Sequence, residues 1–449
     1  MVSYGDLLKD YKIVNDNIHG SITLSKMAWT IVDTPEFQRL RYIKQLSTCY
    51  FVYPNAVHTR FEHSLGTYQI CKKMLHNLKK NSSRKELDII YNIPELQERI
   101  DDNNNNDYLS DCINNNNDYL DDFIIEMVCI GALCHDLGHG PFSHLFDDNF
   151  LKNKTNITEE NKYHEYRSCK LLEKIIKQNK FFDGIFFPNE IKFMWNIINP
   201  DPQIHKDWIY QIVSNSLNSI DVDKFDYLTR DSKMLNINIS FDFIRLVDNA
   251  IILNNRICYP KKVDYDIINM FQTRHYLHKK VYSHKIVISS LLIIIELLDA
   301  FDKITNFTKS VDNLDDFIKY TDDYILNVSQ YIIENSSYDI TVLNQMKSAL
   351  DCIKCHHFYP LIYSNYVDPN SYDDYYYSFD DTDKEIIKFE SVIGFISGKK
   401  NNPLDSVYLY KSKDPYNSLE ILTNTESARL LPSKYQEKLL MIFSKTLKH

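Results

Sequence analysis

Glycine is rare in this chain: only 9 of its 449 residues are glycine, and 13 are proline. Tight hairpins, bulges and barrel corners rely on these two residues, so their scarcity disfavours a β-sandwich or a β-barrel. Long helices with few tight turns fit the same numbers. The length exceeds one typical domain and allows a large core with a second lobe. We therefore predict a mainly α fold with a small C-terminal α+β lobe.

Apolar residues recur at helical spacing in four segments. Thr34 can cap a helix that Pro35 opens and that continues through EFQRLRYIKQL. The other three segments are 124–134, 215–230 and 271–298. Beyond about residue 302 the pattern changes to the short β-like runs VIGFIS, SVYLYKSK and LEILT, followed by a helical tail from Ser433. We expect a helical domain at 1–302 and a smaller lobe at 303–449.

Two segments are compositionally biased. NNNNDYLSDCI begins at Asn103 and NNNNDYLDDFI begins at Asn114, within a polar stretch of about 79–122. Such asparagine-rich repeats cannot bury enough apolar surface to order themselves strongly. We predict that 79–122 is an insertion between two core helices, and that 368–383, DPNSYDDYYYSFDDTD, is an exposed acidic loop.

The formal net charge is −10, whereas a protein that coats nucleic acid is normally basic. A local basic cleft would still accept an anionic substrate. The N-terminus lacks the apolar core of a signal peptide, and the run 286–298 is interrupted and too short to span a bilayer. We expect a cytoplasmic protein with no membrane contact, a nuclear location being left open, and nine cysteines in the reduced state.

Histidine and aspartate crowd the segment LCHDLGHGPFSHLFD, residues 133–147, which also contains two glycines and a proline. A lone His-Asp pair arises often by chance, but this density, with HTRFEH upstream and IDVDKFDYLTRD downstream, argues against coincidence. Neutral imidazoles and carboxylates suit Zn, Fe or Mn, and two of each leave positions open for a water nucleophile. The sequence therefore predicts one divalent transition metal bound by His63, His135, Asp136 and Asp223.

Spacing suggests further roles near such a metal. His144 and Asp147 are three residues apart, so on one helical turn the carboxylate can orient the imidazole. Lys224, Tyr227 and Asp231 lie at i, i+3 and i+7, which places a cation, a phenol and a carboxylate on one helical face. An ordinary amphipathic helix with a charged face would show the same pattern.

Two other clusters carry weaker signals. The segment TRHYLHKKVYSHK could supply the positive potential that a triphosphate needs, although charge runs are more often solvated faces; its basic residues are Arg274, His278, Lys279, Lys280, His284 and Lys285. Cys352-Ile-Lys-Cys355-His356 matches haem-attachment spacing. With no export signal and no second cysteine pair, we expect no metal there.

Six segments occur together in a distinctive order: NDNIHGSITL, IVDTPEFQRLRYIKQL, HTRFEHSLG, LCHDLGHGPFSHLFD, IDVDKFDYLTRD and MFQTRHYLHKKVYSHK. In this order the chain resembles the family of sterile-alpha-motif-and-HD-domain dNTP triphosphohydrolases, without the sterile-alpha-motif domain. The resemblance runs from Lys12 to about Asp302 and more faintly to the C-terminus. Bacterial dGTP triphosphohydrolases share the general pattern. The resemblance implies a hydrolysis in which a dNTP and water give a deoxynucleoside and inorganic triphosphate.

The resemblance also implies residue roles. The metal ligands match the four residues named above. Catalytic and phosphate-contacting positions match His139, His144, Asp147 and His164, with His144 as general acid to the 5′-oxygen. Triphosphate contacts match Arg60, Lys224, Tyr227 and Arg274. Sugar contacts match Gln45, Leu46, Asp231 and Tyr282, the tyrosine and leucine leaving no room for a 2′-hydroxyl.

Members of this family are controlled by nucleotides bound between the subunits of a tetramer, which implies self-association from dimer to tetramer and a regulatory role for the C-terminal lobe. Mg²⁺ is expected with the nucleotide phosphates. A GTP or dGTP activator site matches Lys12, Ile13, Asp33, Gln38 and Arg41. A second, dNTP activator site matches Asn15, Arg245, Lys262, His284 and Lys285. Because Gln38, Arg41 and Gln45 would share one face of the helix opened by Pro35, that helix could join the activator and substrate sites.

The chain departs from the family at several positions. Pro260 replaces an arginine and Asp266 an asparagine at the second activator site, and Lys280 also replaces an arginine. Ser283 replaces a glutamine near the substrate base, and only Cys258 matches a redox cysteine. The active site and the first activator site therefore match the family, whereas the second activator site and the redox cysteines match it only in part.

Two alternatives remain at this stage. One is another HD-domain enzyme, a nucleotidase or phosphodiesterase, for which the sequence shows only one convincing ligand set. The other is a nucleotide-regulated protein that binds single-stranded nucleic acid with little catalysis, which the net charge of −10 disfavours.

Overall fold

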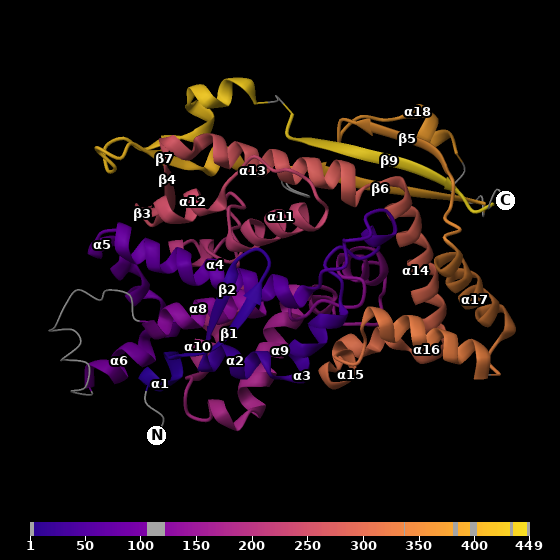
Figure 1. Ribbon diagram of the computed structural model, residues 1–449, viewed down its shortest axis with the longest axis horizontal. Helices are drawn as coiled ribbons and strands as arrows, with labels where there is room; N and C mark the ends of the chain where they lie inside the picture. The colour runs from indigo at the N-terminus through magenta and orange to yellow at the C-terminus, as the bar shows by residue number, and fades with distance from the viewer. Residues whose placement is uncertain are drawn as a thin grey trace.

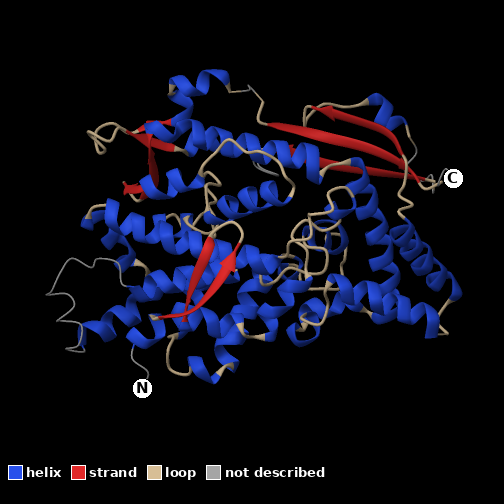
Figure 2. Ribbon diagram, viewed as in Figure 1, coloured by secondary structure: helices blue, strands red, loops and turns tan. Residues whose placement is uncertain are grey.

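A computed structural model describes residues 4–105, 122–335, 337–379, 385–395, 402–431 and 434–446. Helices dominate it, and the longest strands lie in the C-terminal part (Figure 2). The prediction of a mainly α fold with a small C-terminal α+β lobe is confirmed. The division at residue 302 stays a prediction. Helix α14 (Lys285–Thr305) runs across it, and one buried apolar core contains residues from both sides.

Three helices form the centre of the molecule: α4 (Arg60–Asn81), α8 (Asp122–Cys134) and α11 (Val222–Met234), with α4 contacting both of the others. Helix α8 is buried from Phe123 to Cys134, as its almost entirely apolar sequence requires. The predicted helix at 124–134 is therefore confirmed. Thr59 and Glu62 fix the start of α4 through a capping box, in which Glu62 accepts a hydrogen bond from the Thr59 amide at 2.8 Å.

The other helices surround this centre (Figure 1). On the N-terminal side they are α1 (Tyr4–Leu8), α2 (Lys26–Val32), α3 (Pro35–Gln38), α5 (Arg84–Leu87), α6 (Gln97–Asn105), α9 (His164–Gln178), α10 (Pro188–Ile198) and α12 (Phe243–Asn249). On the C-terminal side they are α13 (Asp264–Leu277), α15 (Leu314–Phe317), α16 (Asp322–Asn335), α17 (Ile340–Cys355) and α18 (Asp374–Ser378).

The strands of the described chain form three sheets. A hairpin pairs β1 (Asp10–Asp16) with β2 (Gly20–Ser25). The second sheet has the order β3-β4-β7-β8, formed by Ile251–Leu253, Arg256–Pro260, Tyr408–Tyr410 and Glu420–Ile421. Its parallel β4–β7 pair connects residue 260 of the helical part to residue 410. The third sheet has the order β5-β9-β6, formed by Leu361–Val367, Gln436–Ser444 and Ile386–Gly394.

The β-like runs at VIGFIS, SVYLYKSK and LEILT overlap β6, β7 and β8, but the helical tail predicted from Ser433 is wrong. Strand β9 occupies this segment and is the centre of its sheet, paired on both sides. The sequence LLMIF is apolar enough to fit either a helix or a buried strand, and periodicity alone cannot separate them. The choice depends on β5 and β6, which are distant in sequence.

Three predicted helices have different limits. The helix opened by Pro35 ends at Gln38, and a 3₁₀ turn over Arg39–Tyr42 follows. The segment 215–230 becomes helical only from Val222. The segment 271–298 is divided by a π-helical turn at His278–Tyr282, beyond which the chain bends by 65° into α14.

The predicted insertion at 79–122 is narrower than expected. Leu87, Ile90 and Leu96 are fully buried, and Arg99 forms a buried ion pair with Glu190 of α10. The asparagine repeats at 106–121 lie outside the described residues. In the expected acidic loop, α18 forms with Tyr376 buried, while 380–384 lie outside the described residues. In the described chain no single helix is long and apolar enough to cross a membrane, although the bent pair 261–282 and 285–305 meets that test on length and composition.

Candidate metal centre and its surroundings

The four predicted metal ligands lie together, carried by three different elements. His63 is in the first turn of α4 and Asp223 in the first turn of α11, and the pair His135-Asp136 follows the end of α8. The Nε2 atom of His63 is 3.4 Å from Asp136 Oδ2 and 3.2 Å from Asp223 Oδ1. The Nε2 atom of His135 is 3.4 Å from Asp136 Oδ1 and 3.6 Å from Asp223 Oδ1. Residues up to 160 positions apart thus meet at one point.

These side chains fit a divalent cation. Among the described residues, the buried Nε2 atoms of His63 and His135 lack hydrogen-bond partners, although both face carboxylate oxygens. Two imidazole nitrogens and two carboxylates form the donor set that borderline divalent metals prefer. Asp223 keeps 30% of its side chain exposed, so the cluster is open on that side. The identity of the metal stays a prediction.

The pKa shifts of the candidate ligands indicate that this cluster favours a positive charge. Burial opposes protonation of His63, but the nearby carboxylates of Asp223, Asp226 and Asp136 raise its pKa to about 10. Burial works against ionisation of Asp136 too, yet Arg60 and the neighbouring histidines hold the pKa of that carboxyl well below its usual range. Since a metal needs deprotonated ligands, a bound cation would displace these protons, and its affinity would rise with pH.

Groups outside the cluster fix the orientation of both histidines. His135 Nδ1 is 2.8 Å from the carbonyl oxygen of Ala132, and His63 Nδ1 is 2.7 Å from Asp226 Oδ2. With Nδ1 engaged in each ring, Nε2 points into the cluster. Asp226 was not predicted. Its spacing of three from Asp223 was the available signal, but IDVDKFDYLTRD contains four aspartates and spacing does not rank them.

The loop after α8 is fixed by buried hydrogen bonds that sequence reasoning also missed. Ser168 of α9 accepts from the Gly138 amide at 2.7 Å and donates to the His135 carbonyl at 2.6 Å. Arg39 donates to the carbonyl oxygens of Leu137 and His139 at 2.9 and 2.6 Å. No local pattern marked these partners, because they lie about 30 and 100 positions away.

Three predicted catalytic histidines form a second group next to the first. The rings of His139 and His164 stack with centroids 3.8 Å apart, and His144 lies edge-on to both at 4.9 and 5.3 Å. His139 Nε2 is 3.2 Å from Asp136 Oδ1, which joins this group to the metal candidates.

The predicted support of His144 by Asp147 is wrong. The Asp147 carboxylate is 2.9 Å from His164 Nδ1 and also pairs with Arg167, whereas His144 Nδ1 lies 3.8 Å from Asp148. The reason is local: residues 145–151 form a π-helix, which has a wider turn than an α-helix, so a spacing of three no longer aligns side chains. Burial opposes protonation of His164, but Glu165 and Asp147 raise the pKa of its ring to about 9.

Arg60, predicted to contact a triphosphate, lies directly beside the metal candidates. Its Nη1 donates to Asp136 Oδ2 at 2.6 Å, and its Nε donates to Ser143 Oγ at 3.0 Å. Burial of the His139 ring, together with the charge of Arg60, lowers the pKa of His139 well below the ordinary value. A cationic group therefore borders both the carboxylates and the histidine group.

The predicted substrate residues of α11 approach α13 and the π-helical turn after it. Asp231 accepts from Tyr282 Oη at 2.6 Å and lies 2.7 Å from His58 Nε2, a buried histidine that was not predicted. Lys224 pairs with Asp221 at 3.1 Å, and the charge of Arg274 acts on both Lys224 and Tyr227. Gln45 is buried next to Leu46, and its carbonyl oxygen is 3.5 Å from Arg60 Nη2.

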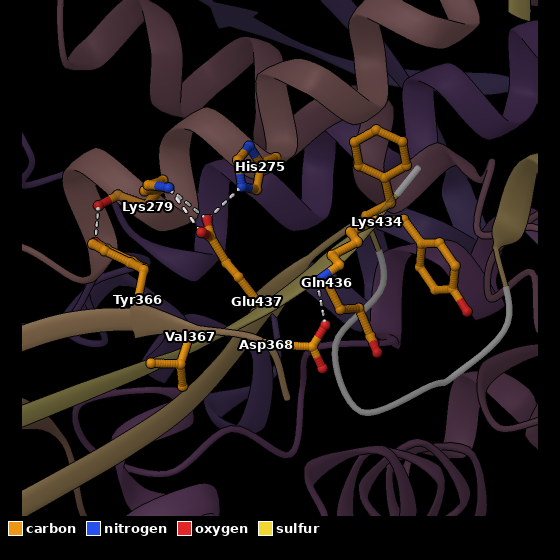
Figure 3. Close-up of a pocket in the computed structure, with 10 residues that line it drawn as sticks. His275, Lys279, Tyr366, Val367, Asp368, Lys434, Gln436 and Glu437 are labelled. Carbon is orange, nitrogen blue, oxygen red and sulfur yellow. Dashed lines mark hydrogen bonds and ion pairs between the residues drawn. The ribbon is translucent and has the colours of Figure 1, made fainter. Parts of the chain in front are cut away.

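The basic segment 273–285 divides between two environments. Arg274 donates to the carbonyl oxygen of Gly394 in β6, and the charges of Arg274, His144 and Lys224 act on His278. Lys279 instead faces a pocket of about 320 Å³ beside the third sheet. Figure 3 shows Lys279 and His275 pointing to Glu437 of β9, at 2.7 and 2.9 Å. Lys279, one of the basic residues of this segment, therefore faces Glu437 and this pocket.

The predicted first activator residues lie on the N-terminal hairpin and the segment after it. Lys12 lies over the Trp29 ring at 4.3 Å, and Ile13 keeps 72% of its surface exposed. Arg41 Nε donates to Gln38 Oε1 at 2.8 Å, and Asp33 ends α2. The idea that one helical face joins Gln38, Arg41 and Gln45 is wrong, because the helix ends at Gln38.

At the predicted second activator site, Arg245 pairs with Asp266 at 2.5 Å and donates to the carbonyl oxygen of Lys262 at 3.2 Å. Asp266, where the family has an asparagine, thus pairs with the arginine of the predicted activator site. Pro260 lies in β4 opposite Tyr410, Asn15 is exposed on β1, and His284 and Lys285 begin α14. The eight cysteines in the described chain are unbridged, Cys258 among them.

The chain is similar in sequence to known proteins. The HD domain family matches residues 60–231, which include all four metal candidates. A SAMHD1 homolog of Dictyostelium discoideum, a deoxynucleoside triphosphate triphosphohydrolase, is 31% identical over 98% of this chain and 78% of its own length. The Xenopus laevis SAMHD1 triphosphohydrolase is 29% identical over 97% and 71%. An HD domain-containing protein of Acanthamoeba polyphaga mimivirus is 42% identical over 69% of this chain, a match that spans 62% of the mimivirus protein.

Proposed function

The chain belongs to the HD-domain family that contains the SAMHD1 deoxynucleoside triphosphate triphosphohydrolases, and we propose that it hydrolyses a dNTP to a deoxynucleoside and inorganic triphosphate. One observation carries the proposal: a cluster of four candidate metal ligands lies directly beside a buried arginine and a group of three histidines. A divalent cation in such a cluster supplies Lewis acidity and a water nucleophile at neutral pH.

The surrounding residues supply binding. Arg60, Lys224 and Arg274 would attract the triphosphate, since charged hydrogen bonds to phosphate are among the strongest in proteins. On the sugar side, the Asp231 carboxylate and the Tyr282 hydroxyl are already joined at 2.6 Å. Asp231 would contact the 3′-hydroxyl together with Gln45. Tyr282 and Leu46 would pack on the deoxyribose and leave no room for a 2′-hydroxyl.

Proton transfer to the leaving 5′-oxygen falls to the histidine group. With a pKa of about 9, His164 holds a proton at neutral pH, and Asp147 keeps its ring oriented. Burial and Arg60 lower the pKa of His144, so that ring is neutral. We therefore assign the stored proton to His164. By the family resemblance we assign its delivery to the 5′-oxygen to His144, whose ring centroid is 5.3 Å from that of His164.

Product analysis tests the reaction. Purified protein is first analysed for bound Fe, Zn and Mn and then incubated with each of the four dNTPs and Mg²⁺. Inorganic triphosphate and a deoxynucleoside in equal amounts are expected. Release of pyrophosphate or orthophosphate alone would exclude this reaction. The four substrates together show whether dGTP is preferred.

Nucleotide control is a separate part of the proposal. It is supported by the surface position of Ile13 and by the pairing of Gln38 with Arg41, two other residues of the predicted first activator site. We expect GTP or dGTP to drive assembly from dimer to tetramer. We expect a dNTP at the second site to activate hydrolysis only weakly, because Arg245 is already paired with Asp266. Sizing with and without GTP distinguishes the cases, since an unchanged distribution excludes GTP-driven assembly.

One observation favours a second candidate, a two-metal HD phosphodiesterase. The ligand atoms of His139, His144 and His164 all lie within 4.8 Å of one another, close enough to hold another ion. Two metal ions per chain, with hydrolysis of cyclic nucleotides and none of dNTPs, would favour that enzyme. One ion per chain with triphosphate release would exclude it.

A further inference from the structure

The N-terminal hairpin reaches the metal candidates through a chain of buried polar contacts. The hairpin turn holds His19, whose Nε2 is 2.6 Å from Asp226 Oδ1. The other oxygen of the same carboxylate, Oδ2, is 2.7 Å from Nδ1 of His63. The side chains of Asp226 and His63 are fully buried, and that of His19 is 5% exposed. One carboxylate therefore joins a surface hairpin to a predicted metal ligand.

Asp226 is held on all sides. Arg230 donates to it through Nε at 2.8 Å and through Nη2 at 2.9 Å, so the carboxylate takes part in four hydrogen bonds. An ionised carboxylate offers about four lone-pair sites, and here all are used. Its position is thus set jointly by α4, α11 and the hairpin. A shift of any one of the three moves the group that orients His63.

The hairpin is attached to this group at a second point. Asp16, the last residue of β1, accepts from Arg230 Nη1 at 2.8 Å through Oδ2. Its other oxygen accepts from the backbone amides of Ile18 and His19 at 2.8 and 2.9 Å, which closes the turn. The same aspartate therefore shapes the turn that presents His19 and fastens that turn to Arg230.

The packing leaves little tolerance for movement. Gly66, one helical turn after His63, faces Asp226 and Arg230 so closely that any Cβ there would overlap both side chains. The Asp226 and Arg230 side chains of α11 therefore pack directly against the α4 backbone at Gly66, which leaves the carboxylate no space to move on that side.

We propose that the hairpin β1–β2 is a positioning element of the metal centre: His19 holds Asp226, which in turn directs Nε2 of His63 toward the metal. The inference rests on the proposed function only in requiring that the four-residue cluster binds a metal. It assigns His19, Asp16 and Asp226 as positioning residues that do not touch substrate. It also means that displacing the hairpin, whose β1 strand is exposed at Lys12 and Ile13, weakens metal binding.

Cobalt titration of metal-free protein tests this without any nucleotide, because the visible absorption of bound Co²⁺ reports both affinity and ligand geometry. Asp226→Asn is expected to lower Co²⁺ affinity about 10–100-fold, the usual effect of losing a carboxylate behind a ligating histidine. His19→Leu is expected to change affinity and spectrum in the same direction by a smaller factor. His19→Gln, whose amide can donate to Asp226 in place of the ring, should restore both.

The double variant His19→Leu/Asp226→Asn shows whether His19 acts through Asp226. If it does, the double variant matches Asp226→Asn alone, because residues that act as a unit are not additive. Glu126→Gln is the matched control. Its carboxylate is also buried, and it connects Ser25 at the end of β2 to α8 without touching a metal candidate, so it should leave the cobalt spectrum unchanged.

Parent-like cobalt affinity and spectrum in His19→Leu would overturn the proposal, as would fully additive losses in the double variant. If His19→Leu does not fold, the comparison of His19→Gln with His19→Ala decides in the same way. Failure of the proposed function is separately visible: parent protein that binds Co²⁺ but releases no triphosphate from any dNTP refutes the reaction and leaves the role of the hairpin intact.

Discussion

Replacing Gly138 by alanine should displace the loop that carries the His-Asp pair. A Cβ at this position would overlap His164 O and Ser168 N and lie 2.8 Å from Arg167 C, all backbone atoms at the start of α9. Normal contact needs about 3.5–4.0 Å, so the loop and α9 must separate by on the order of 1 Å. Backbone cannot rotate away as a side chain can. Overpacking of this kind costs about 1–3 kcal/mol, and a 1 Å misplacement of catalytic groups costs about 100-fold in rate.

The assay compares Gly138→Ala with Gly184→Ala in urea unfolding, metal content and dNTP hydrolysis. Gly184 has φ +71° and no atom near its missing Cβ, so alanine there costs about 1–2 kcal/mol of strain without moving the site. Both variants should lose comparable stability, but only Gly138→Ala should lose most of its activity, with His164 displaced from His139. Parent-like hydrolysis by Gly138→Ala, or equal activity losses in the two variants, would refute the reasoning.

Three further outcomes follow from the same geometry. Substituting His135→Ala or Asp136→Ala should abolish hydrolysis and lower bound metal measured by elemental analysis; retained activity would reject the ligand assignment. Burial raises the pKa of Glu126 from 4.5 to about 7. The folded state therefore favours the protonated carboxyl, and the stability that this group contributes is complete below pH 4.5 and is lost as the pH rises through 7. Relative to the parent, Glu126→Gln should gain up to about 3 kcal/mol of unfolding free energy between pH 4.5 and 8 in urea titrations, and a constant difference would contradict this. Asp266→Asn, by releasing Arg245, should increase the response of hydrolysis to added dNTP activator; no change would show that the ion pair does not limit that site.

The sequence predicted which His and Asp residues meet in this cluster because they occur in short, dense motifs whose residue types already limit the chemistry. His63, His135, Asp136 and Asp223 needed only a helical fold to meet, and the apolar run 124–134 predicted the helix that positions two of them. The failures occur where distant residues decide. β9 is a strand because β5 and β6 cover both of its edges, and its own apolar run fits either state.

Local backbone irregularity caused the other failures. The π-helix after His144 changes which carboxylate lies near which histidine, so correct residue types were paired wrongly. The 3₁₀ turn after Gln38 removed the helical face expected to connect two sites. His58 and Asp226 were missed for a related reason. Each acts on a predicted residue from a distance of more than 160 positions, which spacing rules do not cover.

Three buried arginines surround the loop that bears the His-Asp pair, and their energetics indicate what they are for. Arg39 binds two carbonyl oxygens of the loop, Arg60 binds Asp136, and Arg167 binds the Gly138 carbonyl and Asp147. Burying a guanidinium costs several kcal/mol, and packed apolar residues often stabilise a core as well or better. Stability alone therefore does not explain three such groups at one loop. Apolar residues cannot hold carbonyl oxygens in place, whereas Arg39 and Arg167 hold those of residues 137–139. Arg60 also donates to the hydroxyl of Ser143, one of two residues with positive φ in the same loop. The desolvation cost of these arginines falls at the loop that places His135, Asp136 and His139 side by side. The arginines therefore contribute to the geometry of the site more than to the free energy of folding.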